Sequence, residues 1–391
     1  MNELTIIVGA GQAGIKAAET LRQKGHDGDI LLIGEEAWPP YQRPPLSKAY
    51  LKGELAEERL FLKADDYFET ADITLMTGAR VAAVDPAAHA ITLSDGQSMS
   101  YSRLLLTTGT RARILPLPGA DLSGVHTLRG IDDTKRIGVE LARAASVAII
   151  GGGYIGMEFA AVARSMGKQV AVIEAQDRIL KRSVAPEISD YFQTLHARHG
   201  VRLVLGEGVA GIAGTARAEG VELASGEIVP ADLVLVAVGA APVTELADAA
   251  GLAVDRGIVV DEACRTSAPD IFAAGDCTVF PSQRYGRRIG LESVQNAADQ
   301  AKAAALSMLG EEVVYDPVPW FWSDQYDVKL QIAGLAQGYD RTELVGDPGE
   351  GRFALRYFAG DTLLAVDAVN DPRSHMMARK QLAAQAQAMA A

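Results

Sequence analysis

The feature that most constrains this chain is a pattern near its start that alternates apolar runs with glycines. An apolar run at 4–8 leads into Gly9, Gly11 and Gly14, and a helical stretch then extends to about residue 24. A second apolar run follows and ends in Glu35. This order is typical of a dinucleotide-binding unit. Its glycines let the backbone approach a pyrophosphate at a helix N-terminus, and its terminal acid accepts hydrogen bonds from a ribose.

The same pattern occurs a second time in the middle of the chain. A strand-like run at 147–150 precedes the glycine turn, and the next apolar run, 169–173, ends in an acid. A lone glycine signature is a weak signal, but each copy here has both strands, the helix and the acid. We therefore predict two nucleotide sites. The first includes Gly9, Gly11, Ala13, Gly14 and Glu35, and the second includes Gly151, Gly153, Tyr154, Ile155, Gly156, Glu174 and, close by in sequence, Arg182.

A second internal repeat supports two similar domains. The stretch before Gly109 resembles the stretch before Gly239, and in each a turn glycine, Gly96 or Gly226, lies the same distance upstream. Each copy follows alternating strand-like residues, which predicts a β-meander that returns to a parallel sheet. The sequence predicts an α/β fold with two Rossmann-like domains and a small α+β C-terminal domain. The predicted boundaries are 1–109 with 234–315 for the first domain, 110–233 for the second and 316–391 for the third.

Composition narrows the class of protein. The net charge of −13 argues against a nucleic-acid or anionic membrane partner. No apolar run approaches the ~18–20 residues that a membrane helix needs, and no leading segment resembles a signal peptide, so we expect a cytoplasmic protein. The two cysteines, Cys264 and Cys277, have neither CxxC nor metal-ligand spacing. We expect two reduced structural thiols and no metal site.

One acid helps to decide which nucleotide binds where. Asp276 follows Gly275 at the end of the apolar stretch "IFAAGDC". A carboxylate at the carboxyl end of a strand suits polyol hydroxyls, and FAD carries a ribitol chain whereas NAD does not. The alternative is an aspartate that caps a turn. Together with the two repeated units, Asp276 favours FAD and NADH over two NAD molecules.

The order of these motifs resembles a known family. GAGQAG, Glu35, "RPPLSK", TTG, GGGYIG, Glu174, AVGAAP and AAGDC follow one another as in two-dinucleotide flavoproteins of the glutathione reductase fold. "YQRPPLSK" at 41–48 and "PWFWSDQYDVKLQIAG" at 319–334 resemble the NADH-dependent ferredoxin reductases of bacterial cytochrome P450 and aromatic-ring dioxygenase systems. The resemblance spans essentially the whole chain.

The resemblance implies roles for particular positions. Arg129 would approach the pyrophosphate, the backbone N–H of Val294 would face the flavin O2, and Trp322 would flank the isoalloxazine. For Val294 and Trp322, ordinary core packing is the alternative. The positions that the resemblance assigns to FAD are Ala13, Glu35, Lys48, Val81, Arg129, Asp276 and Val294. Further candidate cofactor-binding residues are Arg43, Thr108, Gly109, Gly239 and Trp322.

The implied reaction is hydride transfer from NADH to FAD, followed by single-electron transfer to a [2Fe–2S] ferredoxin. We predict that Lys48 pairs with Glu158 beside the flavin N5, and that Tyr154 covers the nicotinamide pocket until NADH enters. The alternative is that Lys48 and Glu158 are surface residues and that Tyr154 faces solvent at the start of a helix. A basic docking face would draw on Arg287, Arg288, Lys329, Arg373, Arg379 and Lys380, although scattered solubilising charges explain each equally well.

Other functions remain open at this stage. A disulfide reductase needs a cysteine pair near the flavin, and NADH oxidases of this fold use a cysteine in the first domain, where this chain has none. A rubredoxin reductase or a non-enzymatic flavoprotein of the apoptosis-inducing type are further alternatives. The sequence leaves open whether the protein is a monomer or weak dimer, and which oxygenase receives the electrons.

Overall fold

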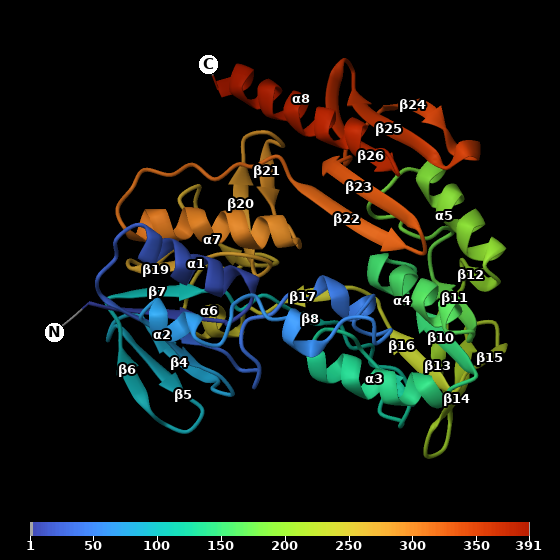
Figure 1. Ribbon diagram of the computed structural model, residues 1–391, viewed down its shortest axis with the longest axis horizontal. Helices are drawn as coiled ribbons and strands as arrows, with labels where there is room; N and C mark the ends of the chain where they lie inside the picture. The colour runs from blue at the N-terminus through green and yellow to red at the C-terminus, as the bar shows by residue number, and fades with distance from the viewer. Residues whose placement is uncertain (1–2, 391) are drawn as a thin grey trace. The chain divides into compact units, whose positions relative to one another are not determined.

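The computed structural model describes residues 3–390, and the side chains of residues 3–385, as an α/β protein. Contacts between residues divide the chain into two units (Figure 1). Unit 1 comprises Met1–Gln42, Glu58–Arg111 and Ala241–Pro319, and unit 2 comprises Arg43–Glu57, Ala112–Ala240 and Trp320–Ala391. The α/β class predicted from the sequence is confirmed, while the three predicted domain boundaries stay a prediction.

Unit 1 is built on a five-stranded parallel sheet in the order β19-β7-β1-β2-β3. Its central strands are continuous apolar runs, as expected for a sheet that is buried on both faces. Their bounds are Leu4–Val8 for β1, Asp29–Ile33 for β2, Ile73–Met76 for β3, Arg103–Leu106 for β7 and Ile271–Ala273 for β19.

Two helices of unit 1 pack against each other, α1 (Gln12–Gln23) and α7 (Val294–Met308). Helix α1 begins directly after Gly11, and small residues on its buried face let it lie close to its neighbours. Its C-cap is Lys24, and the next residue, Gly25, takes the left-handed conformation (φ +82°) that only glycine adopts easily. The helix and the stop that the sequence predicted are confirmed.

Unit 2 repeats this plan with a parallel sheet in the order β12-β11-β10-β16-β9. The strands are Val125–His126 (β9), Ser146–Ile150 (β10), Gln169–Glu174 (β11), Val201–Leu205 (β12) and Leu233–Val236 (β16). The helices are Ile131–Arg143 (α3), Tyr154–Ser165 (α4) and Pro186–Arg198 (α5).

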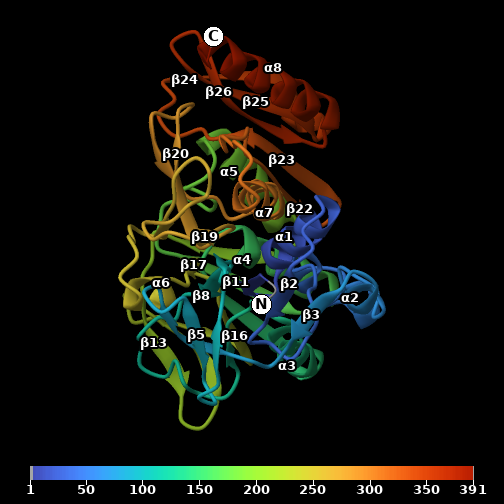
Figure 2. The ribbon, with the colours of Figure 1, turned by 90° about the vertical axis from the view of Figure 1, so that its left-hand side faces the viewer.

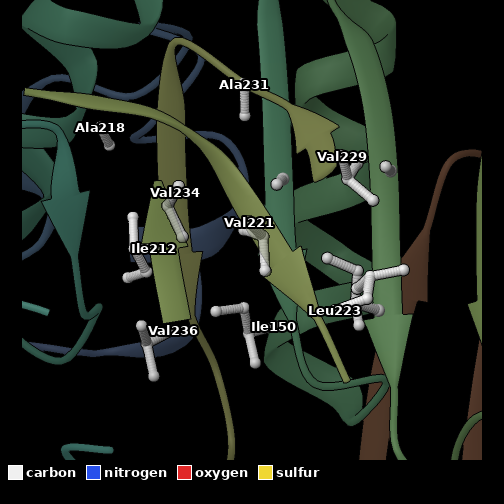
Figure 3. Close-up of a cluster of buried hydrophobic side chains, with 12 residues drawn as sticks. Ile150, Ile212, Ala218, Val221, Leu223, Val229, Ala231, Val234 and Val236 are labelled. Atoms are coloured by element: carbon white, nitrogen blue, oxygen red, sulfur yellow. The ribbon is translucent and has the colours of Figure 1, made fainter. Parts of the chain in front are cut away.

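Each unit carries the predicted meander, which returns the chain to the parallel sheet. In unit 1 it consists of Val81–Asp85 (β4), Ala90–Leu93 (β5) and Ser98–Ser100 (β6), and in unit 2 of Val209–Gly214 (β13), Ala218–Leu223 (β14) and Ile228–Pro230 (β15). Figure 3 shows the core that the second meander forms with the parallel strands, where Ile212, Val221 and Leu223 meet Ile150 and Val234. The meander thus covers one face of the sheet with apolar side chains.

The last part of the chain forms an antiparallel sheet in the order β22-β23-β26-β25-β24, and α8 (Pro372–Ala390) lies along it (Figure 2). The strands are Trp320–Gln325 (β22), Val328–Gly334 (β23), Arg341–Asp347 (β24), Arg352–Ala359 (β25) and Thr362–Val369 (β26). The sequence predicted β23, β25, β26 and the helix. It missed β22 and β24, which lie at the two edges of the sheet; β24 is largely exposed and carries no apolar alternation.

The remaining elements are short. They are η1 (Pro44–Ser47), η2 (Glu57–Arg59), α2 (Tyr67–Thr70), β8 (Thr110–Ala112), β17 (Ala240–Pro242), α6 (Glu245–Ala249), β18 (Ile258–Val259), β20 (Thr278–Ser282), β21 (Arg287–Ile289) and η3 (Pro348–Glu350). No helix in the described residues is long and apolar enough to span a membrane.

A buried carboxyl group lies inside the C-terminal sheet. Asp367 on β26 is fully buried and accepts a hydrogen bond from the Tyr357 hydroxyl, which in turn accepts one from the backbone N–H of Ala185. Burial raises the pKa of Asp367 to about 7, because the charged form loses its hydration. The folded protein therefore holds this proton more tightly than the unfolded chain does.

This proton makes the free energy of unfolding depend on pH. A group whose pKa is raised on folding stabilises the fold fully at low pH, and this stabilisation is lost as pH rises from about 4 to about 7. Asp367→Asn removes the titration, so the variant should gain stability relative to wild type across this range, at about 1.4 kcal/mol for each pH unit of difference. Chemical denaturation of both proteins between pH 4 and 8 measures this. A difference in unfolding free energy that does not change with pH would contradict the assignment.

Candidate functional site

The first glycine turn forms a cradle between β1 and α1. Gly9 has φ +115°, and a Cβ placed on it would lie 2.2 Å from the carbonyl oxygen of Thr107. A Cβ on Gly14 would lie 2.0 Å from the carbonyl oxygen of Gly9. Both glycines are therefore required by the fold itself, since they let the helix start directly against the strand. At Gly11, in contrast, a Cβ would meet no atom within 4 Å.

The open side of this turn is suited to an anion. Gly11 is the N-cap of α1, no side chain caps the helix, and its first turn contains no acid. Helix N-terminal N–H groups and the helix dipole together favour a phosphate at such a position. The space above Gly11 and the uncapped helix fit the pyrophosphate of a dinucleotide.

The Gly275–Asp276 turn lies beside the same helix. A Cβ on Gly275 would lie 3.1 Å from the Cβ of Ala13, so the turn passes close to α1. The amide of Gln300 on α7 holds the turn, because its Oε1 accepts hydrogen bonds from the Gly275 N–H and the Thr278 hydroxyl, both at 2.8 Å. The partly exposed Asp276 is thus fixed near the start of α1, as a polyol-binding role requires.

The other first-site residues predicted from the sequence fall within unit 1. Glu35 lies two residues beyond β2, is exposed and has Arg80 at 3.5 Å. Val81 begins β4 with its side chain buried, so only its backbone is available to a ligand. Val294 begins α7, where the Ser293 side chain caps the helix by accepting a hydrogen bond from the Asn296 N–H.

The turns at Thr108–Gly109 and at Gly239, each of which follows a strand of a parallel sheet, are held by hydrogen bonds within their own unit. The Thr108 hydroxyl donates to the carbonyl of Val243 at 2.6 Å, and Gly109 accepts from the Val243 N–H through its carbonyl. In unit 2, Gly239 has φ +107° and its carbonyl accepts from the Arg113 N–H.

The second glycine turn, in unit 2, repeats the geometry of the first. Cβ atoms on Gly151 and Gly156 would lie 2.4 Å from the Ala237 carbonyl oxygen and 2.2 Å from the Gly151 carbonyl oxygen. Gly153 is the exposed N-cap of α4 and, like Gly11, has open space around it. A second dinucleotide fits here by the same argument.

Glu174 is fixed at this second turn. Its Oε2 accepts a hydrogen bond from the Gly152 N–H at 2.7 Å, and its Oε1 accepts one from the Gln176 N–H at 2.8 Å. The carboxylate is therefore oriented before any ligand arrives, and its remaining lone pairs are available to ribose hydroxyls. Arg182 is exposed further along the chain, and the exposed Ile155 lies in the first turn of α4.

Tyr154 is the first residue of α4. Its ring contacts the ring of Phe321, with centroids 4.7 Å apart. Burial of the hydroxyl, with a smaller contribution from the nearby Asp367, raises the pKa of Tyr154. The side chain thus lies across the start of the helix against β22, and its predicted movement on NADH binding stays a prediction.

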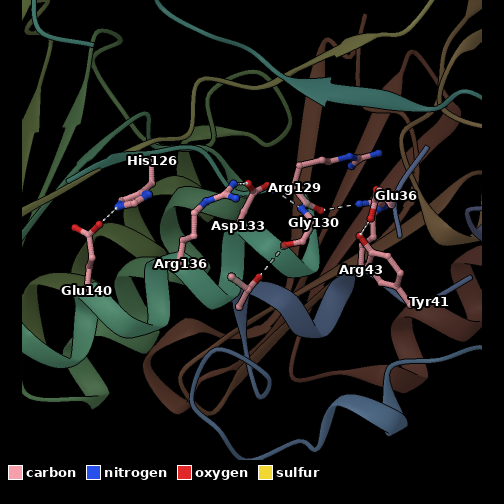
Figure 4. A network of polar contacts seen from close by, with 10 residues as sticks. Glu36, Tyr41, Arg43, His126, Arg129, Gly130, Asp133, Arg136 and Glu140 are labelled. Atoms are coloured by element: carbon pink, nitrogen blue, oxygen red, sulfur yellow. Dashed lines mark hydrogen bonds and ion pairs between the residues drawn. The ribbon is translucent and has the colours of Figure 1, made fainter. Parts of the chain in front are cut away.

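A network of polar contacts joins the "RPPLSK" segment to the start of α3 (Figure 4). Arg43 Nη1 donates to the carbonyl of Arg129 at 2.8 Å. Asp133 Oδ2 accepts from the N–H groups of Arg129 and Gly130, both at 2.9 Å, and so caps α3. The structure therefore brings Arg43 and Arg129, two residues predicted from the sequence, into direct contact within unit 2.

The predicted contact between Lys48 and Glu158 is present. Lys48 Nζ lies 2.6 Å from Glu158 Oε2, and Glu158 on α4 is only 5% exposed. Two serines complete the site: Ser47 Oγ donates to Oε2 at 2.7 Å and Ser323 Oγ donates to Oε1 at 2.8 Å. The alternative reading of two surface residues is thus wrong, while their role in catalysis stays a prediction.

The two serines were not found from the sequence. Ser47 lies inside the quoted "RPPLSK" motif but has no chemical signature of its own. Ser323 lies on β22, which the sequence did not predict as a strand. Trp322 on the same strand stacks with Trp320, with ring centroids 5.7 Å apart. An alternation test of "WFWSDQ" would have placed Ser323 on the face opposite both tryptophans.

Neither cysteine can take part in disulfide chemistry at an exposed site. Cys264 and Cys277 are free and fully buried, and burial raises the pKa of both thiols. Across the residues that the structure describes, no group of three or more His, Cys, Asp or Glu side chains could hold a metal ion.

Comparison with known proteins identifies the family. Residues 4–301 match the family described as pyridine nucleotide-disulphide oxidoreductase, and residues 320–391 match the reductase C-terminal family. The chain belongs to the pyridine nucleotide-disulphide oxidoreductases. Members related to this chain use FAD and NAD(H), and the two glycine cradles fit these two cofactors.

Individual relatives narrow the resemblance. Rhodocoxin reductase from Rhodococcus erythropolis is 46% identical over 97% of this chain and 89% of its own length. The ferredoxin–NAD(+) reductase component of an anthranilate 1,2-dioxygenase system from Burkholderia cepacia is 38% identical over 97% of this chain and 94% of its own. The reductase in the covalent putidaredoxin reductase–putidaredoxin complex superimposes with a TM-score of 0.95 at 38% identity, covering 97% of this chain and 93% of that chain. The family resemblance stated from the motifs is confirmed.

Alanine substitutions at two glycines of the first turn, Gly14 and Gly11, should affect folding and FAD binding separately. Gly14→Ala would drive a Cβ into the Gly9 carbonyl and should destabilise the fold by roughly 1–3 kcal/mol. Gly11→Ala meets no protein atom and should cost the FAD-free fold less than about 1 kcal/mol, yet its methyl group would occupy the space for the pyrophosphate. Unfolding of the FAD-free variants and fluorescence titration with FAD measure the two effects. Wild-type FAD affinity in Gly11→Ala would rule out this cradle as the pyrophosphate site.

Proposed function

We propose that this oxidoreductase takes a hydride from NADH onto FAD and passes the electrons singly to a [2Fe–2S] ferredoxin. The observation that carries the proposal is the combination of two dinucleotide cradles with two fully buried thiols. Without a cysteine pair to store electrons, reducing equivalents from NADH leave the flavin directly for an external acceptor. Relatives that carry the name ferredoxin reductase supply the class of acceptor.

Each cofactor would be held by residues with a defined task. The N-terminus of α1 would neutralise the FAD pyrophosphate, and Asp276 and Glu35 would accept hydrogen bonds from its ribityl and ribose hydroxyls. Glu174 would orient the NADH ribose, and the open N-terminus of α4 would hold its pyrophosphate. Bound FAD supplies the chemistry, because it accepts two electrons from NADH and releases them one at a time.

The Lys48–Glu158 pair is proposed to tune this chemistry. By the family resemblance Lys48 lies beside the flavin, where a cation would favour the reduced cofactor. Glu158 would hold the ammonium in one position, because the two serines already orient the carboxylate. Tyr154 and Trp322 are proposed to cover the nicotinamide and flavin rings. All of these roles concern orientation and electrostatics rather than proton transfer.

We also propose a second electron acceptor and a surface on which the acceptor docks. A rubredoxin–NAD(+) reductase from Pseudomonas putida is 36% identical over 94% of this chain, so rubredoxin is a second acceptor to test.

Of the basic residues predicted to form a docking surface, Lys329 has its Nζ 3.0 Å from Asp324 Oδ1, and the Arg379 guanidinium lies over the Trp320 ring at 4.6 Å. Arg288 on β21 is exposed and offers a better starting point for a docking surface. We expect the protein to act in the cytoplasm as a monomer or weak dimer.

The test of function is NADH-dependent reduction of a purified acceptor. The protein should reduce a [2Fe–2S] ferredoxin with NADH, and this rate should fall steeply as ionic strength rises, since exposed charges are screened within about 8–10 Å. Ferricyanide reduction, which needs no docking surface, is the matched control and should change much less. Rapid ferricyanide reduction without transfer to any iron–sulfur protein or rubredoxin would reject the proposal.

Glu174 predicts a preference for NADH over NADPH. A 2′-phosphate would meet this oriented carboxylate and lose its hydrogen bonds, which are worth roughly 1.5–3 kcal/mol when charged. We expect kcat/KM for NADH to exceed that for NADPH by about ten- to hundredfold. Glu174→Gln should narrow the ratio, whereas Arg182→Gln should widen it by removing an exposed cation. Equal kcat/KM values for the two cofactors in the wild type would refute the assignment.

A further inference from the structure

A chain of buried polar side chains extends from Glu158 into the interior of unit 2. Ser323 Oγ donates to Glu158 Oε1 at 2.8 Å, and Gln325 Nε2 donates to Ser323 Oγ at 3.3 Å. Gln325 Oε1 then lies 2.8 Å from His196 Nε2. Ser323, Gln325 and His196 are all fully buried. The proposed function uses Glu158 but gives no role to Gln325 or His196.

The alternation of β22 explains why two polar residues point inward. Phe321, Ser323 and Gln325 share one face of the strand, and Phe321 contacts Tyr154 at the start of α4. The other face carries Trp320 and Trp322, which stack with each other. The polar face of the strand is therefore directed at α4 and α5 rather than at solvent.

In this chain of hydrogen bonds, every side chain donates in the direction of Glu158. Glu158 is a carboxylate and can only accept, so Ser323 must donate to it. The Ser323 oxygen then accepts from the Gln325 amide nitrogen, which turns the amide oxygen towards His196. His196 must in turn donate from Nε2. One acceptor at Glu158 thus fixes the orientation of three side chains.

The imidazole is suited to this task. Burial lowers the pKa of His196 to about 4, so the ring is neutral at physiological pH and carries one proton. With that proton on Nε2, Nδ1 is an acceptor, and the Tyr326 hydroxyl lies 3.3 Å from it. The Tyr326 hydroxyl can donate to this nitrogen, so its position is compatible with the tautomer that the chain requires.

We propose that His196 and Gln325 are positioning residues, which hold Glu158 in the orientation that places Lys48 for hydride transfer. Removing the Nε2–H donor frees the Gln325 amide to rotate, and Ser323 then loses its fixed partner. Glu158 would keep Ser47 and Lys48 but would no longer be held from the Oε1 side. Small displacements at a hydride-transfer site lower the rate steeply. This inference rests on the proposed function.

The test compares the same substitution at His196, on α5, and at His199, the residue that follows this helix. His196→Phe keeps a flat ring but removes the donor, and we expect it to slow anaerobic reduction of bound FAD by NADH about tenfold without changing the NADH Kd. His196→Gln keeps a donor at the place of Nε2 and should restore the rate to within about twofold. His199→Phe is the control, because the His199 ring stacks on Tyr326 with centroids 3.7 Å apart, while its Nδ1 pairs with the carbonyl of Leu195.

A rate in His196→Phe equal to wild type would overturn the proposal, as would a tenfold loss in the His199→Phe control. An increase in NADH Kd that accounts for the whole effect would also overturn it. Wild-type protein that does not reduce ferredoxin with NADH would instead remove the proposed function. The two failures are therefore distinguishable.

A second measurement needs neither NADH nor turnover, so it applies even if a His196 variant does not fold. Nitrogen-15 NMR of the histidine rings in the full chain should show His196 protonated at Nε2. Ser323→Ala, two hydrogen bonds away, should disturb this signal and leave the His199 signal unchanged. A His196 protonated at Nδ1, or unaffected by Ser323→Ala, would contradict the chain of hydrogen bonds.

Discussion

The close approach of a strand to the helix that follows it is the constraint on which this protein depends. In both units a helix begins so near the preceding turn that a single methyl group on Gly14 or Gly156 would overlap a backbone carbonyl. This approach directs uncapped N–H groups outward at Gly11 and Gly153. In each turn, the glycines packed against backbone carbonyls allow the fold, while the N-cap glycine leaves open space that fits an anion.

In unit 2, several polar contacts converge on a single side chain, that of Glu158. It lies on the helix that starts at the second glycine turn, and it accepts hydrogen bonds from Ser47, Lys48 and Ser323. These donors come from two segments far apart in the sequence, the adjacent Ser47 and Lys48 and, on β22, Ser323. A carboxylate is costly to bury unless it is paired and hydrogen-bonded, and Glu158 is buried together with one ammonium and two hydroxyl donors.

Much of this could be predicted from the sequence, for identifiable reasons. The two repeated units carry periodic apolar runs and glycines, so the strands that bracket Gly9 and Gly151 and the stop at Gly25 were predicted. The contact between Lys48 and Glu158 was a hypothesis from the place of Lys48 in the "RPPLSK" segment and of Glu158 on the helix after the second glycine turn. Edge strands such as β24 carry little apolar signal because their side chains face water. Ser323, Gln325 and His196 could not be found, because a buried hydrogen-bond chain is a property of three-dimensional packing.

The central claim is that electrons from NADH leave this protein singly and directly. Anaerobic mixing of the FAD-loaded protein with limiting NADH and excess [2Fe–2S] ferredoxin tests it, with the ferredoxin spectrum as the readout. The account predicts two reduced ferredoxins for each NADH consumed, because each cluster accepts one electron. Oxidation of NADH with no reduced ferredoxin would contradict it.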